Sequence, residues 1–498
     1  MNLDLDGWLA RRSVRMAIWT AVCALSILKF CYLTADFPNY SPWMIDQAKF
    51  TDEGWWASAA VMHFLTGHWY VAGDYNPGVA LPVWPLLLGT VFHFTGVSVV
   101  AARALNVVIS IATLGVVFAL VRRYTSVKAE TPALLAVLLL SASPFAFVFS
   151  RLAILDTLVV FEFCLLLLVA SYASEGRVWP LAVLALLITA MMLTKTTAAL
   201  LVPAVFWVVW SAMGRKPAGL LRTTLAVGVL AAALLKGYAA LATAEGYGAD
   251  YKYFFVVNAM PDIEWRQAFA TLSELMQSCF WIDRILYPIG MLIFVLTVAW
   301  KRKLWTNPLF AASWMAIAAQ SVFIFSRQDD YAPRYFLVML APLVCIVVLT
   351  FGELMVHARK TAFVLLIAMI GAVVANIVMI GQFLTHRDCD FRDAANSIGN
   401  IVRSHPGQKA LMLGVSGPQI SLMTGIPAIT DGFGTEDMAE KVARYQPGWY
   451  LAWSDTVAEK ESFLSGFQLE KVASYPAFDD DDRGELSIYK MVRKTNVP

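Results

Sequence analysis

Eleven apolar runs, each close to the length that crosses a bilayer, dominate this sequence. Their approximate limits are residues 17–35, 99–121, 131–150, 155–174, 179–194, 197–213, 220–242, 285–300, 308–326, 335–356 and 361–384. A transmembrane helix needs about 20 predominantly apolar residues. Only 15% of the 498 residues are charged, whereas soluble domains carry about 25%. The sequence therefore predicts a mainly α-helical, polytopic membrane protein with about 11 transmembrane helices.

A twelfth apolar stretch, residues 79–97, contains Pro82 and Pro85 and decides the topology. Short cytoplasmic loops are rich in Lys and Arg, and all the basic clusters fall on one side if 79–97 does not cross. These clusters are Arg11–Arg15, Arg122–Lys128, Arg177, Arg215–Arg222, Lys301–Lys303 and Arg359–Lys360. We therefore expect 79–97 to form juxtamembrane or re-entrant helices on the outer face, broken by the prolines.

This sidedness places the remaining segments. The start, Met1–Trp8, lacks the basic segment and cleavage site of a signal peptide, so we expect a cytoplasmic N-terminus and an uncleaved first helix. Segments 36–98, 243–284 and 327–334 become outer loops. We expect residues 1–384 to form a transmembrane domain and residues 385–498 to form an outer domain.

The composition changes after residue 384, where charge, Gly and Pro become more frequent. Predicted helices (390–404, 419–424, 436–445 and 456–464) alternate with predicted strands (410–415, 449–453, 469–475 and 486–491), which indicates a small α/β domain. The segment Gly414–Gly417 matches neither a dinucleotide fingerprint nor a P-loop, so a tight turn is favoured over nucleotide binding. The acidic run Asp479–Asp482 favours a solvated loop over a cation site.

The six cysteines show no CxxC spacing and no pairing with His, so neither a metal centre nor redox chemistry is predicted. Cys279 and Cys389 both fall in segments placed outside the membrane. A disulfide between them stays an open alternative.

Polar residues gather where the outer ends of the predicted helices meet. Asp52 and Glu53 follow the first run, and Asp156 begins another. Carboxylates are costly near a membrane and usually functional there. The cations predicted on the same face are Arg103, Lys195, Arg327 and Arg334. A carboxylate can take a proton from a hydroxyl, and cations can hold a phosphate and stabilise charge as it leaves. A substrate with a lipid tail would explain this location.

Five short motifs in order resemble the GT-C membrane glycosyltransferases, in the branch of the protein mannosyltransferases and lipid A aminoarabinose transferases. They are the acidic pair Asp52-Glu53, Asn76-Pro77 before a helix pair, the run from Arg151 to Asp156, Leu193-Thr194-Lys195, and the run from Arg334 to Leu337. Together they span about residues 15–385. The C-terminal segment is similar only to generic outer domains of that superfamily.

The resemblance implies an inverting transfer of one sugar from a polyprenyl-phosphate donor to a hydroxyl of a lipid, glycan or protein. It implies a site on the periplasmic face of a bacterial inner membrane and a monomer without a nucleic-acid partner. By analogy Asp52 is the general base, Glu53 orients the acceptor, and Asp156 orients substrate or a helper cation. The implied donor phosphate ligands are Lys195, Arg334, Arg103 and Arg327, and the implied substrate contacts are Trp55, Tyr75, Asn76 and Tyr335. No cofactor is expected as a requirement, and a divalent cation is left open.

One departure and several alternatives accompany this interpretation. Some relatives carry Lys or His where this chain has Asn76–Val79, so contacts to the acceptor or phosphate are expected to differ. Asp52 and Asp156 could simply cap helices, and Lys195 could snorkel to the membrane surface. A lipid or sugar transporter fits the composition equally well, although the charges gather at one face and no internal repeat is evident. A non-catalytic scaffold for envelope assembly is the third alternative.

Overall fold

The computed structural model describes residues 11–36, 50–125, 130–174, 177–257, 286–299, 302–325, 333–387, 389–454, 456–476 and 484–494. A helix lies in each of the eleven apolar runs, and the third run holds two. In chain order they are α2 (Arg12–Leu28), α6 (Val99–Tyr124), α7 (Thr131–Ser141), α8 (Pro144–Phe149), α9 (Leu155–Ala170), α10 (Trp179–Thr194), α11 (Val202–Ala212), α12 (Pro217–Ala244), α15 (Leu286–Ala299), α16 (Pro308–Phe325), α17 (Leu337–His357) and α18 (Arg359–Thr385). The predicted class, a mainly helical membrane protein with a small C-terminal sheet, is confirmed.

Five of the described helical segments are long and apolar enough to cross a bilayer by composition. They are α6, α12, α16, Arg334–His357 and α18. Several other apolar helices, α7 and α10 among them, are shorter. The number of about 11 crossings therefore stays a prediction, and so does the sidedness.

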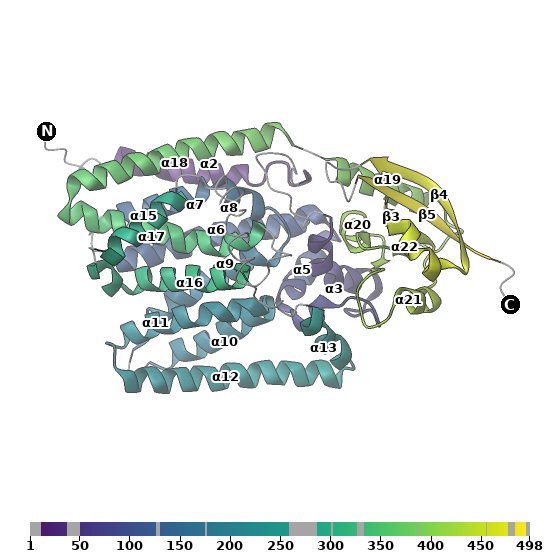
Figure 1. Ribbon diagram of the computed structural model, residues 1–498, viewed down its shortest axis with the longest axis horizontal. Coiled ribbons are helices and arrows are strands. Elements are labelled where there is room, and N and C mark those ends of the chain that lie inside the picture. The colour runs from purple at the N-terminus through teal and green to yellow at the C-terminus, as the bar shows by residue number, and fades with distance from the viewer. Residues whose placement is uncertain are drawn as a thin grey trace.

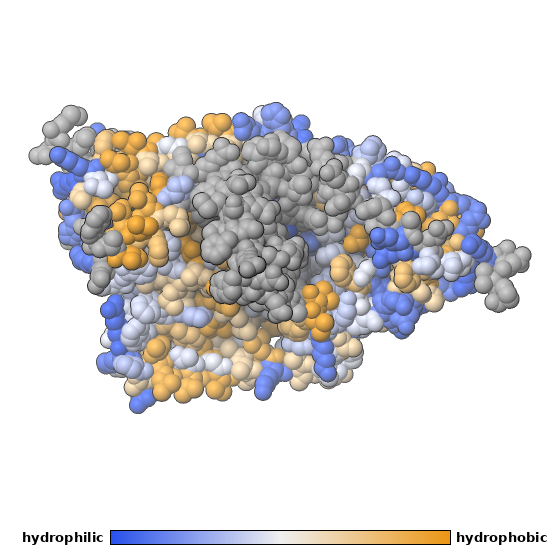
Figure 2. Space-filling view, viewed as in Figure 1, coloured by the Kyte–Doolittle hydropathy of each residue, from blue (hydrophilic) through white to orange (hydrophobic). Residues whose placement is uncertain are grey.

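Burial separates a central helix from a peripheral one. Each helix has an 18-residue window that is its most apolar part. In the segment Arg334–His357, which contains α17, 94% of that window is buried, whereas in α12 only 17% is buried. Along α12, Leu221, Leu225 and Val229 are exposed at a spacing of four, which places them on one outward face. Figure 1 shows α12 along one edge of the bundle, and Figure 2 shows hydrophobic residues covering much of the bundle surface. Such a surface suits contact with lipid.

The segment 50–98 forms helices beside one end of the bundle. It contains α3 (Asp52–Thr66), α4 (Pro77–Ala80) and α5 (Val83–Thr95). Helix α3 ends at Gly67, whose φ of +82° is the left-handed conformation common at helix ends. The break between α4 and α5 falls at Leu81-Pro82, as the proline pattern predicted. Figure 1 shows α3 and α5 between the bundle and the C-terminal sheet.

The described residues between 389 and 494 contain four α-helices, a 3-10 turn and a five-stranded sheet. The helices are α19 (Asp390–Ser404), α20 (Gly417–Thr424), α21 (Met438–Tyr445), α22 (Thr456–Lys460) and a 3-10 turn (Glu461–Leu464). The strands are β1 (Met412–Leu413), β2 (Ala428–Ile429), β3 (Trp449–Trp453), β4 (Phe467–Pro476) and β5 (Glu485–Arg493). The sheet order is β2-β1-β3-β5-β4, with β1 parallel to β2 and β3 and the other pairs antiparallel. Strand β2 has only two residues, and the sequence analysis missed it.

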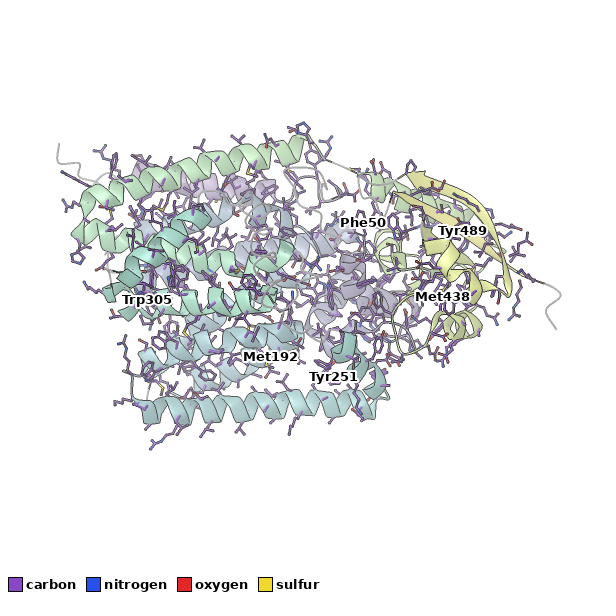
Figure 3. All side chains as sticks on the ribbon, in the orientation of Figure 1. Phe50, Met192, Tyr251, Trp305, Met438 and Tyr489 are labelled. Atoms are coloured by element: carbon purple, nitrogen blue, oxygen red, sulfur yellow. The ribbon has the colours of Figure 1, made fainter. Side chains whose placement is uncertain are left out.

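Aromatic packing joins the two parts of the chain. Phe50, labelled in Figure 3, is fully buried and packs edge-on against Phe391 and Trp453, with ring centroids 5.5 and 5.8 Å away. Both partners belong to the C-terminal residues. The start of α3 is therefore held against that part of the chain.

Candidate functional site

A cavity of about 60 Å³ lies where α3, α9, α13 (Gly248–Val257), α16 and the short 3-10 segments Thr196–Leu201 and Pro333–Phe336 meet. A water molecule needs about 10–15 Å³ measured in this way, so the cavity has room for several. Its lining combines a carboxylate, two cations, two threonines and apolar or aromatic side chains. The lining residues are Trp56, Leu81, Leu155, Asp156, Lys195, Thr196, Thr197, Phe254, Phe323, Arg334 and Tyr335.

Asp156 and Lys195 form an ion pair on one wall of the cavity. The ammonium of Lys195 lies 2.7 Å from Asp156 Oδ1 and 4.4 Å from the centre of the Tyr335 ring. Asp156 is in the first turn of α9, where the helix dipole favours a negative charge. Lys195 follows the last residue of α10 in extended backbone, which turns its side chain out of the helix. Three of the predicted site residues thus meet at one place.

Asp52 and Arg334 form a second ion pair beside the same cavity. A guanidinium nitrogen of Arg334 donates to Asp52 Oδ2, and the Thr51 hydroxyl donates to Asp52 Oδ1 over 3.1 Å. Both side chains of the pair are 11% exposed. Arg334 lines the cavity and Asp52 does not, so Asp52 is connected to the cavity only by its ion pair with Arg334. The two predicted acidic positions, Asp52 and Asp156, are therefore each matched by one predicted cation.

Glu53 and Arg103 are not part of the cavity lining, and the roles that the resemblance implies for them stay predictions. Both side chains are essentially inaccessible to solvent. Arg103 donates to the two carboxylate oxygens of Glu53 over 2.8 and 2.6 Å, and its Nη1 donates to backbone carbonyls of Leu33 and Ala35. Glu53 also accepts from the backbone N–H of Ala153 over 2.7 Å. The pair has no surface left for an acceptor or a phosphate, because protein groups occupy its bonding atoms.

Trp55, Tyr75 and Asn76 also lie outside the cavity lining. Trp55 packs edge-on against Tyr75 and Phe433, with centroids 5.6 and 5.2 Å away. The amide of Asn76 bonds to the backbone of Val71, to the carbonyl of Asp74 and to the carboxylate of Asp250. These contacts hold the segment before α4 in shape. The substrate-binding roles of the three residues stay predictions.

Asp250 organises a contact between two segments that are far apart in the sequence. It accepts from the Tyr70 hydroxyl over 2.6 Å and from the Asn76 amide over 3.0 Å. Burial, and then the hydrogen bond to Asp250, raise the pKa of the Tyr70 hydroxyl well above its usual value. Segments 36–98 and 243–284, which the charge pattern placed on one face, do meet here.

Three predicted features lie outside the described residues. They are the phosphate ligand Arg327, the Cys279 half of the Cys279–Cys389 pair, and the acidic run Asp479–Asp482. Within the part of the chain that the structure describes, no three His, Cys, Asp or Glu side chains come together as a metal site would require. Positive charge in the cavity comes from Lys195 and Arg334.

Some lining residues were missed as site residues. Trp56 lines the cavity in place of its neighbour Trp55, and Phe254 enters from α13. Thr196 and Thr197 follow Lys195 and add hydroxyl groups to the same wall. Adjacency to Asp52 and to Lys195 was the available signal for Trp56 and for the two threonines. No local signal pointed to Phe254.

Comparison with known proteins supports the resemblance seen in the motifs. Residues 77–241 match the family described as dolichyl-phosphate-mannose-protein mannosyltransferase. The fold is similar to that of ArnT from Cupriavidus metallidurans bound to undecaprenyl phosphate, with a TM-score of 0.59, 13% identity and coverage of 99% of this chain and 100% of that one. It is also similar to the oligosaccharyltransferase AglB from Archaeoglobus fulgidus in complex with an inhibitory peptide and a dolichol-phosphate, with a TM-score of 0.56, 12% identity and coverage of 99% and 75%. No curated protein matches the sequence.

Proposed function

The chain resembles the GT-C glycosyltransferases of the mannosyltransferase and ArnT type and has their fold, and we propose that it is an inverting glycosyltransferase. In this proposal a polyprenyl-phosphate-linked sugar is the donor and a hydroxyl of a lipid, glycan or protein is the acceptor. The reaction takes place on the periplasmic face of a bacterial inner membrane. The observation that carries the proposal is the pairing of Asp52 with Arg334 and of Asp156 with Lys195 around one cavity.

The two ion pairs suit a reaction in which cations exchange partners. A lipid-linked phosphate is an anion that Lys and Arg bind by charge-assisted hydrogen bonds. When such a phosphate enters the cavity, it competes with Asp52 for Arg334 and with Asp156 for Lys195. Asp52 then becomes available as a base at the moment when the donor is in place. Binding of the donor would thus prepare the base for the acceptor.

The proposed chemistry is a single displacement. Asp52 takes the proton of the acceptor hydroxyl, and that oxygen forms a bond to the anomeric carbon. The bond between this carbon and the phosphate oxygen breaks, and its electrons stay on the departing lipid phosphate. Lys195 and Arg334 stabilise the charge that grows on that phosphate. Attack opposite to the leaving group inverts the anomeric configuration.

The side chains of the cavity suggest how the donor is oriented. Trp56, Phe254 and Tyr335 present aromatic surface, which suits the face of a sugar or the first part of a lipid. Thr196 and Thr197 offer hydroxyl groups to a sugar or phosphate. In this proposal Asp156 holds Lys195 until the donor phosphate binds, and it then contacts the donor sugar.

Purified protein mixed with several polyprenyl-phosphate sugars and candidate acceptors tests the proposal. Transfer of one sugar with inversion is the expected result. A product with retained configuration would overturn the single displacement. Movement of a sugar-lipid across vesicles without any transfer would instead identify a transporter.

A further inference from the structure

A backbone N–H group in the first turn of α3 donates to a residue that is distant in the sequence. The first amides of a helix have no partner within it, and Thr51 makes no side-chain cap to α3. The backbone N–H of Gly54 instead donates to Oε1 of Gln419 over 2.5 Å. Gln419 belongs to α20 in the C-terminal residues and lies 365 positions further along the chain. It acts as an N-cap supplied from another part of the fold.

The same side chain also holds Glu53. Its Nε2 donates to Glu53 Oε2 over 3.0 Å, and Gln419 is completely buried. Both ends of the amide are therefore used on two successive residues of α3. A third contact lies next to them, since the indole of Trp55 donates to the carbonyl of Val415 over 3.1 Å.

Gly54 explains how α20 approaches so closely. A Cβ at this position would lie 2.2 Å from the backbone nitrogen of Gln419 and 2.4 Å from its Cα. These are backbone atoms, so they cannot move aside as the end of a flexible side chain could. The sequence Asp52-Glu53-Gly54 thus combines a residue beside the cavity, a buried acceptor and a docking point for α20.

We propose that Gln419 is a positioning residue, which caps α3 and thereby fixes Asp52 against Arg334. This inference rests on the proposed function of Asp52. Gln419 is not part of the cavity lining, and its side-chain amide bonds to Glu53 and Gly54, so it acts on Asp52 through the first turn of α3. A shift of about 1 Å in a reacting group can lower the reaction rate about 100-fold. Fixing the first turn of α3 would therefore keep Asp52 at the position that the reaction requires.

The C-terminal residues have another attachment to the segment 50–98. Lys441 is buried and lies 2.9 Å from Asp74 Oδ1, and the backbone N–H of Thr430 donates to the same oxygen over 3.0 Å. This contact does not involve α3. We therefore expect the C-terminal residues to stay docked when the Gln419 side chain is shortened.

The first experiment compares full-length Gln419→Ala and Ser421→Ala with wild type. Ser421 is on the same helix and is buried, and its hydroxyl has no partner among the described residues. For Gln419→Ala we expect kcat to fall by about 10- to 100-fold, with KM for donor and acceptor within about threefold, and faster hydrogen exchange in a peptide covering residues 52–56. Ser421→Ala is expected to match wild type in all three readouts. Wild-type kcat in a folded Gln419→Ala protein would overturn the proposal, and so would an equal loss in Ser421→Ala.

A second variant, Gln419→Glu, separates positioning from general damage. It places a carboxylate against that of Glu53, and two adjacent carboxylates resist ionising together. At acidic pH the new side chain holds a proton and can again donate to Glu53, so kcat relative to wild type is expected to rise as pH falls. A ratio that does not change with pH would contradict the proposal. If wild type shows no transfer, or Asp52→Asn is fully active, the proposed function fails, while hydrogen exchange at residues 52–56 still tests the cap.

Discussion

Asp52 and Glu53 are neighbours in the chain, yet they lie in opposite surroundings. Asp52 is beside a cavity and pairs with Arg334, which itself lines that cavity. Glu53 is buried in the protein. Its carboxylate accepts hydrogen bonds from Arg103, from the backbone N–H of Ala153 and from the Gln419 amide. Successive residues of a helix point about 100° apart, so one acidic pair can serve two different sites.

The difference suggests how to distinguish a carboxylate that can act as a base from one that only stabilises the fold. A carboxylate that must accept a proton needs a partner that can be replaced, and the donor phosphate could replace Asp52 at Arg334. A carboxylate whose oxygens are all held by buried donors cannot change partners without breaking the fold. The ion pair alone does not decide the role, because both residues have one.

The largest expected effect comes from Asp52→Asn. We expect transfer activity to fall by about 10²- to 10⁴-fold, because the amide cannot accept the proton of the acceptor. Thermal unfolding and activity assays on the same preparation check this result. A folded variant with full activity would remove Asp52 from the role of base.

Glu53→Gln is expected to act mainly on stability. The change leaves the buried guanidinium of Arg103 without its counter-charge, which costs about 3–5 kcal/mol. Thermal unfolding should show a much larger drop in Tm than for Asp52→Asn. The double variant Glu53→Met with Arg103→Met removes both charges and should recover part of the loss. If Glu53→Gln loses activity at wild-type Tm, the contrast between the two residues is wrong.

Lys195→Met is expected to weaken use of the donor. A hydrogen bond to a charged group contributes about 1.5–3 kcal/mol, so kcat/KM for the donor should fall roughly 10- to 100-fold. Lys195→Arg keeps the charge and serves as the matched control with a smaller loss. Steady-state rates at several donor concentrations check the prediction, and an unchanged value for the Met variant would refute it.

The smallest expected effect comes from Tyr70→Phe, because Tyr70 is not part of the cavity lining and bonds to neither ion pair. It removes the hydrogen bond to Asp250 and should lower the free energy of unfolding by about 1 kcal/mol. Neither kcat nor KM should change. A large loss of activity would mean that the contact between segments 36–98 and 243–284 matters for the reaction.

Much of the fold could be predicted from local patterns. Apolar runs of sufficient length indicated the bundle helices, and Pro82 indicated the break before α5. The helix Asp390–Ser404 and the strand Trp449–Trp453 were predicted with the limits observed. Strand β2 was missed because a strand of two residues is too short to show the alternation of apolar and polar side chains that indicates a strand.

The site could be predicted only in part. Asp156, Lys195, Arg334 and Tyr335 meet at the cavity, since helix ends on one face tend to come together. Arg103 and Trp55 were assigned to substrate, and the structure places both elsewhere. Their burial depends on which face of a helix meets its neighbours, and this is set by tertiary packing. No spacing in the sequence connects Gly54 with Gln419.

The cap on α3 also has a consequence for how the protein is made. A ribosome adds Gly54 long before it adds Gln419, because 365 positions separate them. During that interval the bundle helices can enter the membrane while the first turn of α3 still lacks its partner. The newly made chain can therefore close this contact only at a late stage of translation, after the start of α3 and the bundle helices have been made.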